Sequence, residues 1–165
     1  MNVKRYDINI SGYKITVWGE HTNVVAVCLD PNEIDEFEYR IRNSAKICGP
    51  GHLEDTIYRG LTKYGQEGKI LPLLKPQPLW GTPFQRKVWA ELYKLPIGQL
   101  ITYGELAQKV GNPHGARAVG AAVGANPITI IVPCHRVVAK NGPGGFGGNL
   151  KMKAALLAIE GLQLP

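Results

Sequence analysis

Cysteine is scarce in this sequence: there are three among 165 residues, too few and unevenly numbered for a framework of disulfide bonds. No apolar run approaches the roughly eighteen residues that a membrane-spanning helix needs. The first ten residues, MNVKRYDINI, contain no apolar stretch typical of a signal peptide. We therefore expect a cytoplasmic protein in a reducing setting, with at least one free thiol, rather than a membrane or secreted protein.

Acidic residues are rare in the second half of the chain. Residues 81–165 contain nine Lys and Arg but three Asp and Glu, whereas residues 1–80 contain ten of each kind. The whole net charge of +6 therefore lies in the C-terminal half. This asymmetry favours a polyanion such as nucleic acid as the partner of that half, and a basic surface that serves solubility is the alternative.

Proline crowds into residues 72–83, PLLKPQPLWGTP, and this composition predicts a stiff linker between two units. Before it, alternating apolar residues around Ser11-Gly12 predict a β-hairpin, and the apolar run 24–29 predicts a central strand. Helical spacing joins two further sets of apolar residues: Ile34, Phe37 and Ile41, then Leu53, Ile57, Leu61 and Tyr64. We expect an α/β domain over residues 1–77.

The second unit, residues 78–165, is mostly helical. Thr82–Gln85 and Thr102–Glu105 are both capping boxes that predict helix starts. Further helices are expected over 115–125 and 150–160, the last of them capped by Asn149.

Between these helices, residues 128–132 form an apolar run typical of a short strand, and a Gly-rich loop follows over 141–148. The helix that starts at Thr102 and the helix over 115–125 are joined by a turn at Gly111-Asn112-Pro113. Together they form a candidate helix-turn-helix.

The second helix of this motif carries almost no large side chains. Its small residues are Ala116, Ala118, Gly120, Ala121, Ala122, Gly124 and Ala125. Small residues allow a close approach, either to a bound surface or to the protein core. Arg117 is the only charged residue of the helix, and it suits either a phosphate contact or insertion into DNA.

Cys134, within IIVPCHRVV, is the sharpest chemical feature. If a helical turn starts there, its free N–H groups favour a thiolate, and His135 and Arg136 add donors and positive charge. A lowered thiol pKa would make Cys134 a strong nucleophile near neutral pH. The alternative is a buried structural cysteine beside a solvated His-Arg pair.

The run IVPCHRVV resembles the active-site signature of the O6-alkylguanine-DNA alkyltransferases. The segments TPFQRKVWAELYKLPIGQLITYGELAQKVGNPHGARAVGAAVGANP and GGFGGNLKMKAALLAIEG are also similar to that family, so the resemblance covers residues 82–161. It implies a two-domain α+β protein with a small ribonuclease-H-like domain over residues 1–77. The second domain, residues 78–165, would carry a winged-helix-like helix-turn-helix and the active-site loop.

The resemblance also implies an activity, namely repair of O6-alkylguanine in DNA by irreversible, single-turnover transfer of the alkyl group to Cys134. His135 and Glu160 would activate the thiol through a water, and Tyr103 would donate a proton to the departing guanine. Asn126 would be a hinge that connects the recognition helix with the segment before Cys134.

The resemblance assigns DNA binding to the helix-turn-helix. Arg117 would enter the minor groove and fill the place of the flipped nucleotide. The other implied DNA contacts are Tyr103, Ala116, Ala118, Gly120 and Ala121. The implied substrate pocket consists of Pro133, Val137, Phe146, Gly147 and Gly148. Many relatives have tyrosine and serine where this chain has Phe146 and Gly147, so the side-chain contacts to the lesion differ here.

The resemblance implies no cofactor. Some family members hold a structural zinc, but Cys28, Cys48, His21 and His52 have no convincing four-ligand spacing, so we expect no metal. A disulfide between Cys28 and Cys48 stays open. The expected partner is double-stranded DNA containing O6-alkylguanine, with O4-alkylthymine as a further candidate lesion. We expect a monomer that can cluster on DNA.

Three other functions compete with repair. A relative that recognises the alkylated base without reacting would lack the reactive cysteine, which is present here as Cys134. A helix-turn-helix regulator that senses alkylation would need an additional metal-binding module. A thiol hydrolase using Cys134, His135 and Glu160 would need turnover and an oxyanion hole, which nothing in the sequence specifically indicates.

Overall fold

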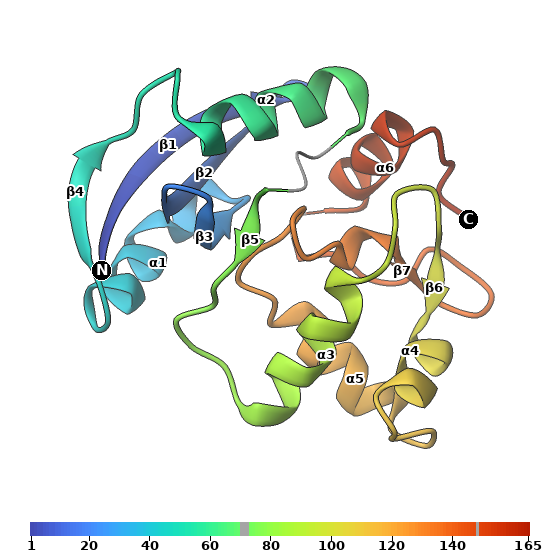
Figure 1. Ribbon diagram of the computed structural model, residues 1–165. Helices are drawn as coiled ribbons and strands as arrows, with labels where there is room; N and C mark the ends of the chain where they lie inside the picture. Colours follow the sequence, from blue (N-terminus) through green and yellow to red (C-terminus); the bar gives the residue numbers. More distant parts are fainter. Residues whose placement is uncertain (70–72, 148) are drawn as a thin grey trace. The chain divides into compact units, whose positions relative to one another are not determined.

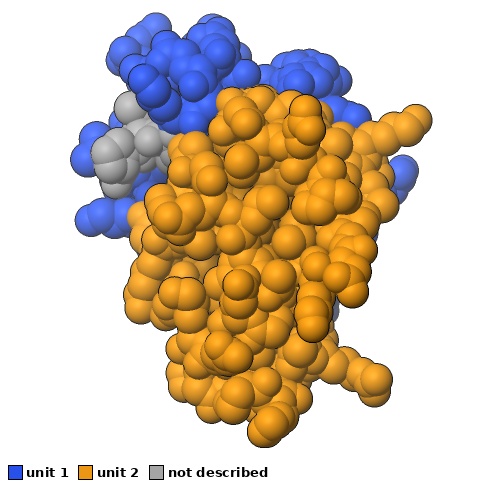
Figure 2. All heavy atoms as spheres, turned by 90° about the vertical axis from the view of Figure 1, so that its right-hand side faces the viewer, with its two compact units in different colours: residues 1–80, 127–131 blue, residues 81–126, 132–165 orange. Residues whose placement is uncertain are grey.

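The computed structural model describes residues 1–69, 73–147 and 149–165. The chain divides into two compact units, which Figure 2 colours separately. Unit 1 comprises residues 1–80 and 127–131, and unit 2 comprises residues 81–126 and 132–165. The fold is mixed α+β (Figure 1). Within the described ranges, no helix has the length and apolar character needed to cross a membrane.

Unit 1 is built on a five-stranded sheet in the order β4-β1-β2-β3-β5 (Figure 1). Its strands are β1 (Asn2–Ile10), β2 (Tyr13–Glu20), β3 (Asn23–Cys28), β4 (Lys46–Pro50) and β5 (Lys75–Pro76). Neighbours β1, β2 and β3 are antiparallel, whereas β4 and β5 pair in parallel at the two edges. Ser11 and Gly12 have φ of 52° and 83°, as a tight two-residue hairpin turn requires. The predicted hairpin and central strand are confirmed.

Two α-helices of unit 1, α1 (Ile34–Arg42) and α2 (Thr56–Glu67), pack against the sheet, and a short 3-10 helix, η1 (Pro31–Glu33), precedes α1. Both predicted helices are confirmed, but Leu53 is not part of the second one: it precedes α2 and is 66% exposed. The helix begins later because Asp55 is the N-cap, and its carboxylate is held by Tyr6 and Lys4.

The proline-rich stretch is not a free linker where the structure describes it. Lys75–Pro76 forms the edge strand β5: the Lys75 N–H donates to the Thr22 carbonyl at 2.9 Å, and the Gln77 N–H donates to the Val24 carbonyl at 2.8 Å. Proline is tolerated at a sheet edge because the missing N–H is on the side that has no partner strand. The predicted linker also includes Pro72, which lies outside the described residues.

Unit 2 consists mainly of helices with the predicted caps. These helices are α3 (Pro83–Tyr93), α4 (Tyr103–Lys109), α5 (Ala116–Gly124), α6 (Leu150–Ile159) and the 3-10 helix η2 (Cys134–Arg136). Short strands β6 (Ile101–Thr102) and β7 (Val137–Val138) pair in parallel. Thr82 and Thr102 form complete capping boxes, and the Asn149 side chain caps α6.

The helix-turn-helix formed by α4 and α5 packs against α3. The Trp89 indole on α3 donates to the Ala122 carbonyl on α5 at 2.8 Å, with both residues buried. Gly111, in the turn between α4 and α5, has φ of 78°, a conformation that favours glycine. The hydrogen bond to Trp89 therefore fixes the buried side of α5, and its opposite face is left accessible.

Residues 127–131 belong to unit 1, although they stand between two parts of unit 2 in the sequence. The Val27 N–H on β3 donates to the Pro127 carbonyl at 2.8 Å, and Val27 forms a parallel bridge with Ile128. The predicted strand over 128–132 is wrong in its regularity: the segment makes isolated bridges and then turns. The turn is at Ile130, whose φ of 73° is incompatible with a strand.

Candidate active site

Cys134 begins the 3-10 helix η2 directly after Pro133, and it is only 6% exposed. Its backbone N–H donates to the Val132 carbonyl at 2.8 Å, which tightens the chain ahead of the helix. Neighbouring side chains point apart in an extended strand but are about a third of a turn apart in a 3-10 helix. The helical turn considered at Cys134 is therefore present, and His135 is part of it.

A buried ionic network extends from this turn. His135 Nε2 lies 2.5 Å from Glu160 Oε2, and Arg136 Nε donates to Glu160 Oε1 at 2.6 Å. The side chains of His135 and Glu160 are fully enclosed. Arg136 Nη1 also donates to the Leu95 carbonyl at 2.7 Å, at the end of α3. Glu160 is thus a buried carboxylate with a hydrogen-bond partner on each oxygen, and its side chain is not exposed to solvent at the helix end.

The thiol is not ionised in advance. Burial raises the pKa of the Cys134 thiol above its ordinary value, so the predicted lowering of this pKa is wrong. Contributions in the opposite direction come from the Asn126 side chain, the charge of Lys153 and the N–H groups of Cys134 and His135. The helical-turn effect expected from the sequence is therefore present, but desolvation outweighs it.

His135 is neutral at neutral pH. Burial lowers the pKa of His135 below its usual value, although the bond to Glu160 acts in the opposite direction. A neutral imidazole beside a protonated thiol is able to take up a proton from it. Glu160 would then stabilise the imidazolium, as the carboxylate does in a protease triad.

Asn126 and Tyr103 belong to the helix-turn-helix. Asn126 lies two residues after the end of α5, and its Nδ2 donates to the Val132 carbonyl at 2.8 Å. The same side chain hydrogen-bonds to Cys134. Tyr103 begins α4, and its hydroxyl accepts the Gly145 N–H from the Gly-rich loop at 3.3 Å. The structure thus connects Asn126 with the thiol and Tyr103 with the loop.

Helix α5 presents an outer face with few side-chain atoms. Arg117, Ala118 and Ala121 are exposed on it, whereas Ala116 and Gly120 are half-buried. Another molecule can therefore come close to the helix backbone, with Arg117 as the only long side chain on this face.

The residues of the implied substrate pocket differ in burial. Pro133 and Val137 flank η2 and are buried, whereas Phe146 is half-buried and Gly147 exposed in the Gly-rich loop. Gly148 lies outside the described residues. The chain therefore places Pro133 and Val137 directly beside the turn that begins with Cys134.

Two buried cations lie in this region: the sequence indicated Arg136 as a source of positive charge, but it did not indicate Lys153. Arg136 binds Glu160, as described above, and Lys153 on α6 is fully enclosed. A sequence signal for Lys153 exists: it precedes Leu156 and Leu157 by three and four residues, so it shares the apolar face of α6.

In the described part of the chain, no three His, Cys, Asp or Glu residues form a group that could hold a metal ion. Cys28 is buried, and its thiol donates to the Asp30 carbonyl at 3.0 Å, whereas Cys48 is exposed. Both are free thiols, so the disulfide that the sequence left open is not formed in this structure.

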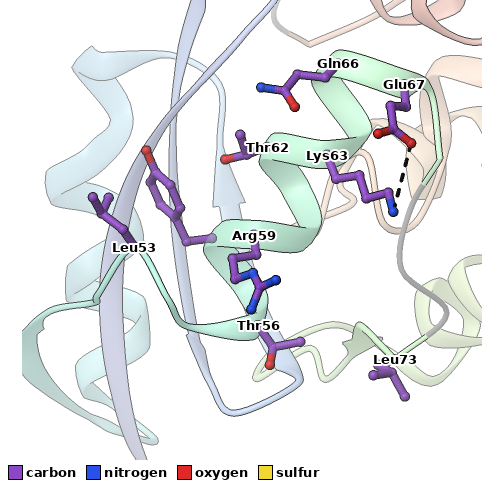
Figure 3. A pocket seen from close by; sticks show the side chains of 9 residues that line it. Leu53, Thr56, Arg59, Thr62, Lys63, Gln66, Glu67 and Leu73 are labelled. Carbon is purple, nitrogen blue, oxygen red and sulfur yellow. Dashed lines mark ion pairs between the residues drawn. The ribbon is translucent and has the colours of Figure 1, made fainter.

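Unit 1 has a hollow on α2 that the sequence does not predict (Figure 3). It is lined by Leu53, Thr56, Tyr58, Arg59, Thr62, Lys63, Gln66, Glu67 and Leu73. Lys63 pairs with Glu67 at 3.9 Å, and Arg59 lies 4.0 Å from Glu54, so the charges are balanced. None of these lining residues is a cysteine or histidine, and we assign no chemistry to this hollow.

Fold and site together define a class: two-unit α+β proteins in which the unit with the helix-turn-helix holds a buried cysteine on a 3-10 turn. A family model described as 6-O-methylguanine DNA methyltransferase, DNA binding domain, matches residues 83–162. The methylated-DNA–protein-cysteine methyltransferase of Shigella flexneri is 40% identical over 148 residues, which are 89% of this chain and 82% of that protein. The chain therefore belongs to the methylated-DNA–protein-cysteine methyltransferase family.

Solved structures of methyltransferases are similar to this structure over nearly the whole chain. The O6-methylguanine methyltransferase of Mycobacterium tuberculosis has a TM-score of 0.77 and 31% identity, covering 99% of this chain and 95% of its own. A structure of the M. tuberculosis protein in complex with DNA has the same TM-score and identity. The methyltransferase of Salmonella typhimurium is 55% identical over 85 residues, so the match spans about half of each chain.

Proposed function

We propose that this chain repairs DNA by moving the alkyl group of O6-alkylguanine onto Cys134 in one irreversible turnover. The observation that carries the proposal is the setting of Cys134: an enclosed thiol on a tight turn, next to the buried pair of His135 and Glu160. Relatives named methylated-DNA–protein-cysteine methyltransferase support the same reaction for this chain.

The transfer exchanges one bond for another. The Cys134 sulfur bonds to the alkyl carbon while the bond from that carbon to O6 breaks, and its electron pair stays on the base. The sulfur gives its proton to His135, and the guanine takes one from Tyr103 on a ring nitrogen. A proton then passes through solvent from the His135 imidazolium to the Tyr103 phenolate, so atoms and charge balance. The product is a thioether, which resists hydrolysis, and each molecule therefore acts once.

His135 is the proposed acceptor of the thiol proton, directly or through a water. Its lowered pKa supports this role, because only the neutral ring can accept a proton. Glu160 orients the ring and stabilises its charged form. Arg136 Nε donates to the other carboxylate oxygen of Glu160 and so helps to hold this carboxylate against the ring.

Tyr103 is the proposed proton donor to the departing guanine. Its hydroxyl oxygen accepts the Gly145 N–H, which leaves the hydroxyl hydrogen for a bond to the base. Asn126 is the proposed hinge, and its bonds to Val132 and Cys134 support that role. Pro133, Val137, Phe146, Gly147 and Gly148 are the proposed pocket residues.

Helix α5 is the proposed DNA-binding helix. The O6 atom lies inside the duplex, so the nucleotide must leave the stack before the thiol can reach it. Arg117, exposed among small residues, suits insertion into the space left behind, and Ala116, Ala118, Gly120, Ala121 and Tyr103 would lie against the DNA. The basic C-terminal half supports a phosphate contribution to binding.

We extend the proposal to the finer fold and its setting. The order of β3, β2, β1 and β4 with α1 supports a ribonuclease-H-like domain over residues 1–77. The α4–α5 motif with β6 and β7 supports a winged-helix-like domain over residues 78–165. A repair protein of this kind would work in the cytoplasm, on the nucleoid when bound to DNA.

Mass spectrometry tests the proposal directly. The intact protein is mixed with a duplex containing one O6-methylguanine, with Cys134→Ser in parallel, and the modified peptide is identified. We expect a gain of one methyl group on Cys134, one per molecule and absent from the variant. Tight binding without a mass change would instead identify a protein that recognises the alkylated base without reacting. If the protein neither binds the duplex nor takes up the methyl group, the proposed substrate is wrong.

A further inference from the structure

Ile130 has a backbone conformation that an isoleucine rarely adopts. Its φ is 73°, and the Ile131 N–H donates to the Thr129 carbonyl at 2.9 Å across it. A hydrogen bond between residues i and i+2 around a central φ of this value is typical of a classic γ-turn, which is rare and strained. A side chain branched at Cβ adds to the strain, so glycine would be the ordinary residue at this position.

The strained residue is held in place by its surroundings. The Ile130 side chain has no exposed surface. Ahead of it, Ile128 forms a parallel bridge with Val27 on β3, and the Val27 N–H donates to the Pro127 carbonyl at 2.8 Å. A strained conformation persists only where the surrounding structure leaves no alternative, and such residues cluster at active sites. Its position four residues before Cys134 therefore calls for a role in the site.

The turn at Ile130 leads directly to the residue that anchors Cys134. Val132 is two residues further on, and its carbonyl accepts two hydrogen bonds, from Asn126 Nδ2 and from the Cys134 N–H, both at 2.8 Å. The second of these bonds closes an inverse γ-turn at Pro133, where φ is −81° and ψ is 65°. The direction that the chain takes at Ile130 thus decides where the Val132 carbonyl lies, and this carbonyl fixes the start of the η2 turn.

Isoleucine has a property at this position that glycine lacks. Glycine would relieve the strain, but it populates positive and negative φ about equally and would allow several directions of the following chain. An enclosed side chain that is branched at Cβ is stiff and restricts the backbone to one of them. The strained isoleucine therefore gives the segment that ends at Cys134 a single direction.

We propose that Ile130 is a positioning residue for the reaction of Cys134: its strained turn fixes the direction of residues 131–133 and so the place of the enclosed thiol. The role rests on the proposed function for the reaction itself, whereas the strain and the placement of the thiol are properties of the chain without DNA. Ile130 acts through the backbone, by way of the Val132 carbonyl, rather than on the reacting atoms.

Two pairs of variants test whether the turn is strained. Ile130→Ala and Ile130→Gly both remove the buried side chain, but only glycine adopts a φ of 73° without strain. We expect the unfolding equilibrium constant, measured with urea, to be several-fold lower for Ile130→Gly than for Ile130→Ala. Ile128 is the matched control, since it is also buried and its φ is not positive. There, glycine should raise this constant about two- to fivefold relative to alanine.

Two rates report the placement of the thiol. Carbamidomethylation of Cys134 by iodoacetamide, followed on its peptide by mass spectrometry, reports how well the thiol is enclosed, and the exposed Cys48 is the internal control. Transfer from a free O6-alkylguanine base reports the reaction without DNA binding. For Ile130→Gly we expect faster labelling of Cys134 and a maximal transfer rate reduced on the order of tenfold to a hundredfold, as misplacement near a reacting centre produces.

Two further readouts distinguish positioning from a structural role. The base concentration at half-maximal rate should not change in Ile130→Gly, because Ile130 acts on the place of the thiol and not on the binding of the base. Ile130→Val, which keeps the branch at Cβ, should retain the wild-type labelling and transfer rates. Transfer rates that simply follow the stability of the variants would overturn the positioning role.

The remaining outcomes separate the two proposals. If Ile130→Gly is less stable than Ile130→Ala, the turn is not strained and the positioning role fails. Wild-type labelling and transfer rates in a folded Ile130→Gly variant would overturn it as well. A wild-type protein that transfers nothing, while Ile130→Gly still exposes Cys134 to iodoacetamide, would overturn the proposed function alone. Should Ile130→Gly not fold, Ile130→Leu, which keeps the volume but not the branch at Cβ, replaces it in both rate assays with the same expected direction.

Discussion

Arg136 and Glu160 form an ion pair with Nε and Oε1 2.6 Å apart, and their side chains are 4% and 0% exposed. His135 binds the other oxygen of the same carboxylate. The buried Glu160 carboxylate therefore bonds both to the Arg136 guanidinium and to the titratable His135 ring. The stability of unit 2 and the proposed activation of Cys134 depend on the same side chain.

Glu160→Gln should consequently impair both properties. It leaves the Arg136 guanidinium buried without its counter-charge, and breaking a buried pair in this way costs about 3–5 kcal/mol. We expect that loss in the free energy of unfolding measured with urea. Alkyl transfer should also slow, since the His135 imidazolium would lose its stabilising charge.

A double variant separates the two effects. In Arg136→Met with Glu160→Leu, neither partner leaves an unpaired charge, and apolar replacements of buried pairs are often neutral or stabilising. We expect stability to recover toward the wild-type value while transfer stays slow. An undiminished transfer rate in this double variant would contradict the role given to Glu160.

Local signals predicted much of this fold because each is decided within a few residues. Thr82, Thr102 and Asn149 cap helices by bonding to an N–H three residues on, so their effect needs no distant partner. The Ser11-Gly12 turn is equally local. Leu53 was misassigned because its helical spacing was correct, but the bonds of Asp55 to Tyr6 and Lys4, about fifty residues away, fix the helix start.

The site was harder to predict wherever burial decides its chemistry. Cys134, His135 and Glu160 could be singled out by resemblance, but the raised pKa of Cys134 follows from desolvation that only the folded chain imposes. Lys153 has an ordinary place in an apolar helix pattern, and nothing local shows that its partners are loop carbonyls. The turn at Ile130 is likewise invisible in an apolar run that is typical of a strand.

Lys153 should also leave a signature in the pH dependence of stability. Burial lowers the pKa of Lys153 to about 8, below the roughly 10.4 of an unfolded chain. Between these values the unfolded state binds more protons, so the free energy of unfolding contributed by this group rises with pH. Relative to Lys153→Met, the wild type should gain about 3 kcal/mol between pH 8 and 10.4.

Urea titrations of both chains at a series of pH values measure this difference, and Lys151→Met is the control for an exposed lysine on the same helix. The charge of Lys153 also acts on the Cys134 thiol, so the measured difference includes the coupling between these two groups. A difference between wild type and Lys153→Met that stays constant across the window would contradict the lowered pKa.

Arg117→Ala should impair transfer from duplex DNA without affecting the transfer reaction itself. The side chain is exposed on α5, so its removal should change the free energy of unfolding by no more than about 0.5 kcal/mol. Transfer from an O6-methylguanine duplex should slow strongly, because nothing would fill the space of the flipped nucleotide. Transfer from the free base should be unchanged. Equal slowing with duplex and free base would exclude the insertion role of Arg117.

Gly144→Ala should disturb the contact between the loop and Tyr103. At φ of 71° an alanine is strained by about 1–2 kcal/mol. Its Cβ would also lie 3.0 Å from the Tyr103 hydroxyl oxygen and 3.2 Å from the Ala139 nitrogen. We expect lower stability in urea and slower transfer from the free base, because Tyr103 must move. Gly142→Ala, where a Cβ meets nothing within 4 Å, should behave as the wild type in both assays. If the two variants proved equally active, the position of Tyr103 against the loop would not matter for the reaction.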